Sequence, residues 1–137
     1  MKRITTKLAF LSLFILFLSS CASAPDKIDY ELSEEAFFKS AQKAMDLNQY
    51  RLAIYYYEVY LVRYPENHQK TIAAEYERAF IFYKTKDYEY SKVLFNQILD
   101  KFENSPFTVL YPERYKTLSE TLIGIIDEKT KGKKKKV

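Results

Sequence analysis

Apolar residues from position 33 onward recur with the three- and four-residue spacing of α-helices. Polar or proline-containing stretches interrupt that spacing four times, so the pattern predicts five helices. The expected ranges are 33–47, 50–64, 69–84, 88–102 and about 112–129. Two glycines and four prolines are too few for a fold built from short strands and tight turns. We therefore predict an all-α domain over residues 33–129.

The pattern repeats once, at an offset of 38 residues. Self-similarity at such a period is typical of helical-repeat proteins, in which each unit buries its core against the next. We therefore expect a short α-solenoid of two helical hairpins. The matched pairs are Ala41 with Ala79, Tyr50 with Tyr88, Ala53 with Ser91, Tyr57 with Phe95, Tyr60 with Ile98, Leu61 with Leu99 and Tyr64 with Phe102.

The fifth helix is expected to cap the second hairpin, because two repeats alone make a marginal core. Pro112 suits the first helical position, where its missing N–H costs nothing. The helix is predicted to pack on Phe95, Leu99 and Phe102. The apolar residues on its packing side are expected to be Tyr115, Leu118, Leu122, Ile125 and Ile126.

The first twenty residues have the pattern of a signal peptide. Lys2, Arg3 and Lys7 precede an apolar run over 8–18, which ends in small residues. Eleven helical residues reach about 16 Å, which is too short for a hydrocarbon core of ~30 Å. Residues 1–20 are therefore predicted to be a cleaved leader and not a membrane-spanning helix.

Leu18-Ser19-Ser20-Cys21 resembles the bacterial lipobox. That resemblance implies lipid on the Cys21 thiol and cleavage before it, so that Cys21 begins the mature chain. Ala22, in place of aspartate, implies sorting to the outer membrane, with residues 21–32 as a lipid-anchored tether. The alternative is an ordinary signal peptide with an incidental cysteine.

The net charge of +4 comes from the two ends of the chain. Residues 21–128 hold 13 basic and 18 acidic residues, whereas six lysines crowd the last nine positions. The body is therefore mildly acidic, which argues against nucleic acid as a partner. Residues 130–137 are predicted to be a disordered lysine-rich tail; attraction to an anionic surface is the functional alternative.

The composition offers little for catalysis. One histidine and one cysteine leave too few groups for a zinc site or a Cys/His nucleophile pair, and two isolated glycines cannot form a phosphate-binding loop. His68 follows Pro65 in an expected turn, where an exposed loop histidine is the simplest interpretation. We expect a non-enzymatic protein with no metal, cofactor or small-molecule substrate.

The hairpins resemble the tetratricopeptide repeat. Asn48-Gln49-Tyr50 and Lys86-Asp87-Tyr88 match its turn, Ala53 matches the alanine of its second helix, and Pro65 matches its terminal proline. Glu103 departs from the second proline position, and the period exceeds the usual length of about 34 residues.

That resemblance implies a concave groove, lined by the first helix of each hairpin, that binds a protein partner. Ordinary packing between repeats is the alternative. The groove positions carried over are Phe38, Gln42 and Met45 in the first hairpin and Tyr76, Phe80 and Tyr83 in the second.

The segments 63–67 and 102–106, with Pro65 and Pro106, resemble the repeat ends of the BamD family. Its members are tetratricopeptide lipoproteins of the outer-membrane β-barrel assembly machinery. The resemblance implies a shortened, lipid-anchored scaffold on the periplasmic face of the outer membrane. Its partners would be the β-barrel assembly protein, the other lipoprotein subunits or unfolded barrel precursors. BamD relatives carry more repeats, and some of their partner-binding surfaces lie in the repeats that are missing here. The alternative is a tetratricopeptide lipoprotein that regulates cell-wall enzymes or division.

Overall fold

The structure is a computed structural model and describes residues 32–134. The predicted leader, Cys21 and all but the last residue of the tether lie outside this range, as do residues 135–137. The predicted all-α fold of two hairpins and a capping helix is confirmed. The helices are α2 (Glu34–Asp46), α3 (Tyr50–Arg63), α4 (His68–Lys84), α5 (Tyr88–Asn104) and α6 (Arg114–Lys134), with a 3₁₀ turn, η1 (Thr108–Leu110), before the last.

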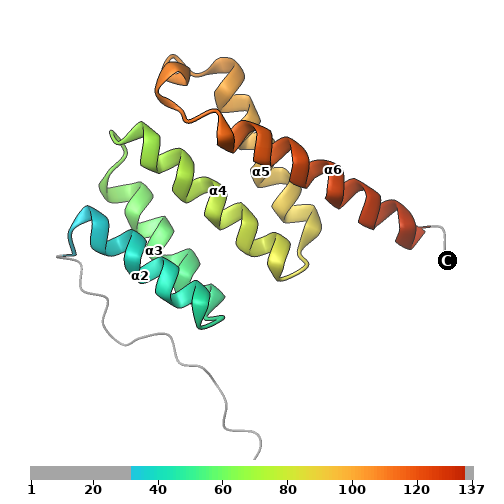
Figure 1. The fold of residues 1–137 in the computed structure, drawn as a ribbon, viewed down its shortest axis with the longest axis horizontal. Helices are drawn as coiled ribbons and strands as arrows, with labels where there is room; N and C mark the ends of the chain where they lie inside the picture. The colour runs from blue at the N-terminus through green and yellow to red at the C-terminus, as the bar shows by residue number, and fades with distance from the viewer. Residues whose placement is uncertain (1–31, 135–137) are drawn as a thin grey trace, which may run out of the picture.

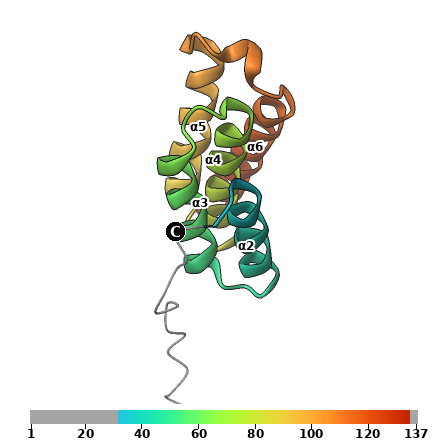
Figure 2. The same ribbon diagram turned by 90° about the vertical axis from the view of Figure 1, so that its left-hand side faces the viewer.

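The helices form two layers. Figure 1 shows α4 between α2 and α6, and the side view in Figure 2 shows α3 and α5 displaced to the other side. We call α2, α4 and α6 the inner layer, and α3 and α5 the outer layer. In the part of the chain that the structure describes, no helix is long and apolar enough to cross a bilayer.

Two cores hold the layers together, and α4 belongs to both. The first core, between α2, α3 and α4, consists of Phe37, Ala41, Ala44, Met45, Ala53, Tyr57, Tyr60, Ala74 and Ile81. The second core, between α4, α5 and α6, consists of Ile72, Ala73, Tyr76, Ala79, Leu94, Phe95, Ile98, Phe102, Tyr115, Leu122 and Ile126. The two cores therefore share a helix, and the two hairpins are expected to fold as one unit.

Both hairpins turn with the same backbone motif. One residue in each turn has a positive φ, 57° at Asn48 and 68° at Lys86. The N–H of the following residue donates to the carbonyl oxygen five residues back, at 2.8 Å in the first turn and 2.9 Å in the second. This Schellman arrangement satisfies the last carbonyl groups of the helix. Asparagine tolerates the left-handed backbone, whereas lysine adopts it at a steric cost.

Helix α6 caps the second hairpin, and Tyr115, Leu122 and Ile126 are buried as predicted, but Leu118 is not. Leu118 is 41% exposed, whereas Ser119 is fully buried. The Ser119 hydroxyl donates to the Tyr115 carbonyl oxygen at 2.7 Å, so the helix itself satisfies it. A small side chain at this position lets α6 approach its neighbours closely, as Ala79 does in α4.

The predicted ends of α6 are also wrong. The helix begins at Arg114, so Pro112 precedes it and is not its first residue. Its other end extends to Lys134, five residues beyond the expected 129, so residues 130–134 are helical.

Truncation of a core residue in α6 tests its role as a cap. Leu122→Ala is expected to lower the free energy of unfolding by about 2–5 kcal/mol, because Leu122 is only 8% exposed within the second core. The measurement is urea denaturation of the chain carrying Cys21→Ala. Leu118→Ala is the matched control and should cost under about 1 kcal/mol, since that residue is exposed and lies outside the second core. A similar loss in both variants would contradict the packing described.

A substitution in the second turn, at Lys86, is expected to raise the stability of the fold. Lys86→Gly should stabilise the fold by about 1 kcal/mol, because glycine adopts a φ of 68° without the Cβ clash. Lys86→Ala keeps that clash and should give no gain, so it separates the backbone effect from loss of the side chain. The comparison needs only thermal melts of the three proteins, and an equal gain in the alanine variant would exclude this explanation.

Candidate functional site

The inner side of α4 carries the sequence-predicted groove residues of the second hairpin. Ala73, Tyr76, Phe80 and Tyr83 follow one another at three- and four-residue steps and therefore share one side of the helix. Glu77 lies four residues after Ala73 and three before Phe80, on the same side. Figure 1 shows that α2 and α6 flank α4 on either side. The inner layer therefore brings the predicted residues of both hairpins toward one surface.

Phe80 and Tyr83 form the open part of this side. Their rings stack at 5.9 Å with an interplanar angle of 19°, and Phe80 stacks in turn on Tyr76 at 6.2 Å and 9°. Phe80 and Tyr83 are both half-buried, and Phe80 packs against both cores. We call Phe80 and Tyr83 the aromatic ladder. Because these stacked rings remain partly exposed, a partner can contact them without any rearrangement of the helix.

Helix α2 contributes Phe38 and Gln42 to the same layer. Phe38 is half-buried and meets Tyr57 and Tyr60 edge-on, with ring centroids 5.7 Å and 4.6 Å apart. Gln42 is exposed, and its amide donates to an Asp46 carboxylate oxygen at 3.5 Å. The partner-binding role of Phe38, Gln42, Phe80 and Tyr83 stays a prediction.

Met45 and Tyr76 were predicted to line the groove, but both are buried in the structure. They are only 7% and 8% exposed and belong to the first and second cores. The Tyr76 ring lies 5.6 Å from Phe95 and 5.3 Å from Tyr115, so the capping helix covers it. Burial raises the pKa of Tyr76 to about 12. Sequence spacing could not reveal this cover, because it comes from α6.

Glu77 is the inner-layer residue that sequence reasoning missed. It is half-buried, and its burial raises the pKa of the carboxyl group above the ordinary value, while Arg114 of α6 acts in the opposite direction. Its charge also contributes to the raised pKa of Tyr57 and of Tyr76. The available signal was its position three residues before Phe80, on the side already assigned to the groove.

A second surface feature lies where the inter-helix loops meet the start of α2. It is an open hollow of about 630 Å³. Its lining residues are Glu34, Arg63, Tyr64, Pro65, Glu66, Asn67, His68, Gln69 and Leu110. Within residues 32–134, no three His, Cys, Asp or Glu side chains are grouped as metal ligands would be.

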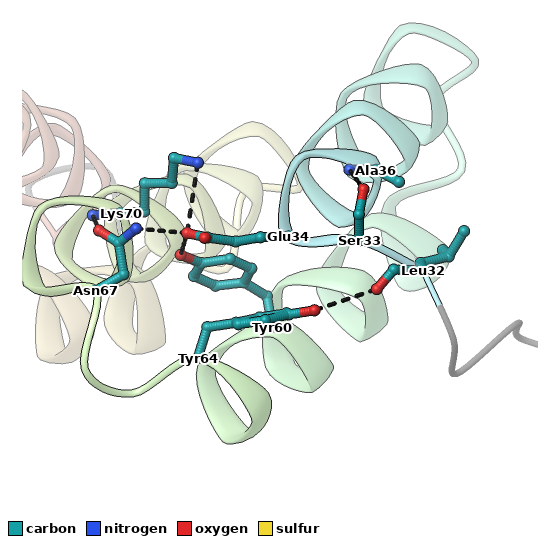
Figure 3. A network of polar contacts seen from close by, with 8 residues as sticks. All are labelled: Leu32, Ser33, Glu34, Ala36, Tyr60, Tyr64, Asn67 and Lys70. Carbon is teal, nitrogen blue, oxygen red and sulfur yellow. Dashed lines mark hydrogen bonds and ion pairs between the residues drawn. The ribbon is translucent and has the colours of Figure 1, made fainter.

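Glu34 organises one wall of this hollow (Figure 3). One of its carboxylate oxygens accepts hydrogen bonds from the Tyr60 hydroxyl, at 2.8 Å, and from the Asn67 amide, and lies 3.4 Å from the Lys70 ammonium. The hydrogen bond from Tyr60 is the largest cause that lowers the pKa of Glu34. The Tyr64 hydroxyl donates to the Leu32 carbonyl oxygen at 3.2 Å, which fixes the start of the domain. These contacts join α2, α3 and α4.

His68 also lines the hollow. It is the first residue of α4 and is half-buried, in contrast to the expected exposed loop histidine. Its ring stacks on Phe107 at 3.9 Å and 18°. Phe107 is itself 45% exposed, so the stack ties the α5–α6 connection to α4 at the surface of the domain.

Comparisons with known proteins give one informative relative. An uncharacterized protein of Treponema pallidum (strain Nichols) is 32% identical over 112 residues, which take in 79% of this chain. The chain covers 44% of the length of that protein. No known family matches the chain, and no solved structure is significantly similar. The site is therefore interpreted from its own geometry.

The Glu34 network predicts pH-dependent stability. Because the folded pKa of Glu34 is lowered, ionised Glu34 stabilises the fold above the ordinary carboxyl pKa, and this contribution disappears as the pH falls through the lowered value. Glu34→Gln should therefore cost about 1–2 kcal/mol at pH 7 and much less at pH 3. Glu35→Gln, an exposed neighbour, should change stability by under about 0.5 kcal/mol. Urea denaturation at both pH values measures this; equal losses of stability for Glu34→Gln at pH 7 and pH 3 would refute the charge effect.

Proposed function

We propose that this protein is a non-enzymatic, lipid-anchored scaffold that binds another protein through its inner layer. The observation that carries the proposal is the aromatic ladder of Phe80 and Tyr83, which remains half-exposed on the inner layer. Rings that are already packed lose little further freedom on binding, so they are efficient anchors for a partner. The two shared cores hold these side chains on helices and not on loops, which favours a preformed surface.

The anchoring part of the proposal rests on the lipobox at 18–21. Cys21 lies eleven residues before Leu32, where the described domain begins. A chain of that length spans at most about 40 Å. A lipid on Cys21 would therefore keep the scaffold within that distance of the membrane, on the outer membrane's periplasmic face in our proposal.

The specific role that we propose is a shortened, BamD-like subunit of outer-membrane protein assembly. Its support is the resemblance of the segments 63–67 and 102–106 to BamD repeat ends, together with the lipobox. Pro65 follows the end of α3 and Pro106 follows the end of α5, so both segments mark helix ends in this chain. The β-barrel assembly protein is then the expected partner.

The lipid and the partner are tested separately. Cys21→Ala should abolish incorporation of labelled palmitate and move the protein from the membrane pellet to the soluble fraction, with its helical circular dichroism unchanged. Ser20→Ala keeps a small residue before the cysteine and should leave anchoring intact. A Cys21→Ala protein that still pellets after a high-salt wash would refute the lipid anchor.

Crosslinking of the wild-type protein in its own membranes, followed by purification and mass spectrometry, tests the partner. Recovery of the β-barrel assembly protein, reduced by Gln42→Lys in α2, supports the BamD-like role. Recovery of a peptidoglycan synthase or hydrolase instead would replace that role with regulation of cell-wall enzymes. Equal recovery from the wild type and the Gln42→Lys variant would show that the inner layer is not the binding surface.

A further inference from the structure

Glu77 differs from the other half-buried carboxylates of the domain. Within residues 32–134 there are four, and three have a lysine partner from another helix. The pairs are Glu34 with Lys70, Glu75 with Lys101, and Asp127 with Lys92. Glu77 has no cation within 4.0 Å among the described residues.

The cation that acts on Glu77 is already held elsewhere. The Arg114 guanidinium donates to the Tyr115 hydroxyl at 2.8 Å and lies 4.7 Å from the centroid of the same ring. It lowers the pKa of Glu77, but burial outweighs it and leaves the net shift upward. The cost of burying the Glu77 carboxylate is therefore only partly offset within the chain.

Aromatic residues lie next to Glu77 along α4 and on the helices beside it. Tyr76 precedes it directly, and Phe80 follows one turn later on the same side of α4. Tyr57 of α3 and Tyr115 of α6 come from the neighbouring helices. Burial raises the pKa of Tyr57, with a further contribution from the charge of Glu77, and Tyr115 contacts Tyr76 with ring centroids 5.3 Å apart. Ring faces attract cations and also pack against the methylene stems of long basic side chains.

We infer that Glu77 receives an arginine or lysine side chain of the protein that binds the inner layer. A carboxylate without a cation of its own, among aromatic rings, complements the charged head of such a side chain together with its apolar stem. The aromatic ladder beside it would take the apolar residues that flank the basic one. This inference rests on the proposed binding function of the inner layer and adds the chemistry that the partner must present.

Selection of binding peptides tests the inference without knowledge of the partner. The probe is a library of random twelve-residue peptides displayed on phage, selected on the immobilised chain carrying Cys21→Ala. The sequences recovered on this protein should be enriched in one arginine or lysine flanked by apolar residues. The same selection on a Glu77→Gln variant should lose that enrichment, whereas Glu103→Gln, the same charge change at an exposed site of α5, should keep it.

Calorimetry on the best recovered peptide then isolates the charge. Replacing its basic residue by citrulline for arginine, or by norleucine for lysine, should weaken binding to the wild-type chain at least tenfold, and Glu77→Gln should remove most of that difference. Circular dichroism and melting of each variant establish that it is folded. No basic enrichment, or enrichment that Glu77→Gln leaves unchanged, overturns the inference.

Two inner-layer variants distinguish failure of the Glu77 inference from failure of the proposed binding function. Tyr83→Ala removes part of the aromatic ladder, and Gln42→Lys changes an exposed side chain whose loss cannot unfold the core. If the selected peptides lack a basic residue but bind only when Tyr83 and Gln42 are unchanged, the inner layer is a binding surface in which Glu77 has no role. Peptides indifferent to both positions, or no selected peptides at all, would overturn the binding surface and the inference together.

Discussion

The whole arrangement depends on α4 being packed on two sides. Ala74 and Ile81 face the first core, whereas Ile72 and Ala79 face the second. Neighbouring helices can pack this tightly on one another only where side chains are small, and the Ser91 hydroxyl donates to the Ala79 carbonyl oxygen at 2.9 Å across one such contact. With two sides committed to packing, the inner side of α4 is the one left to meet a partner. The position of the candidate site therefore follows from the position of α4.

The sequence predicted part of the packing of the first hairpin. Ala41 of α2 and Ala53, Tyr57 and Tyr60 of α3, all matched in the 38-residue repeat, are buried. Prediction worked at these positions because the repeat marks the same side of the helices in both hairpins. The capping helix is different, since Leu118 with Ile125 and Ser119 with Ile126 define two registers that share Leu122. Hydrophobicity favours the first set, but the close approach of α6 selects the one that includes the small, internally satisfied Ser119.

The candidate site could be predicted only in part, for a related reason. A repeat pattern indicates which positions point to the inner layer, but not what a neighbouring helix places over them. Tyr76 is covered because Tyr115 comes from a helix that has no counterpart in the 38-residue repeat. Glu77 was not predicted because its distinguishing feature is the lack of an ion pair among the described residues. The sequence does not reveal that Lys101 pairs with Glu75 and not with Glu77.

Tyrosine predominates because the domain is thin. The cores are only two helices deep, so a long side chain that starts inside ends near the surface, where a ring needs a polar tip. Tyr60 shows the consequence, since its side chain is fully buried while its hydroxyl reaches Glu34. Tyr64 reaches the Leu32 carbonyl and Tyr50 reaches Asn48 in the same way. Phenylalanine would fill the same space but could not form these hydrogen bonds. The tyrosine-rich composition therefore does two tasks at once: it fills the cores, and it fixes the start of α2 and the first turn, which hold the inner layer in place.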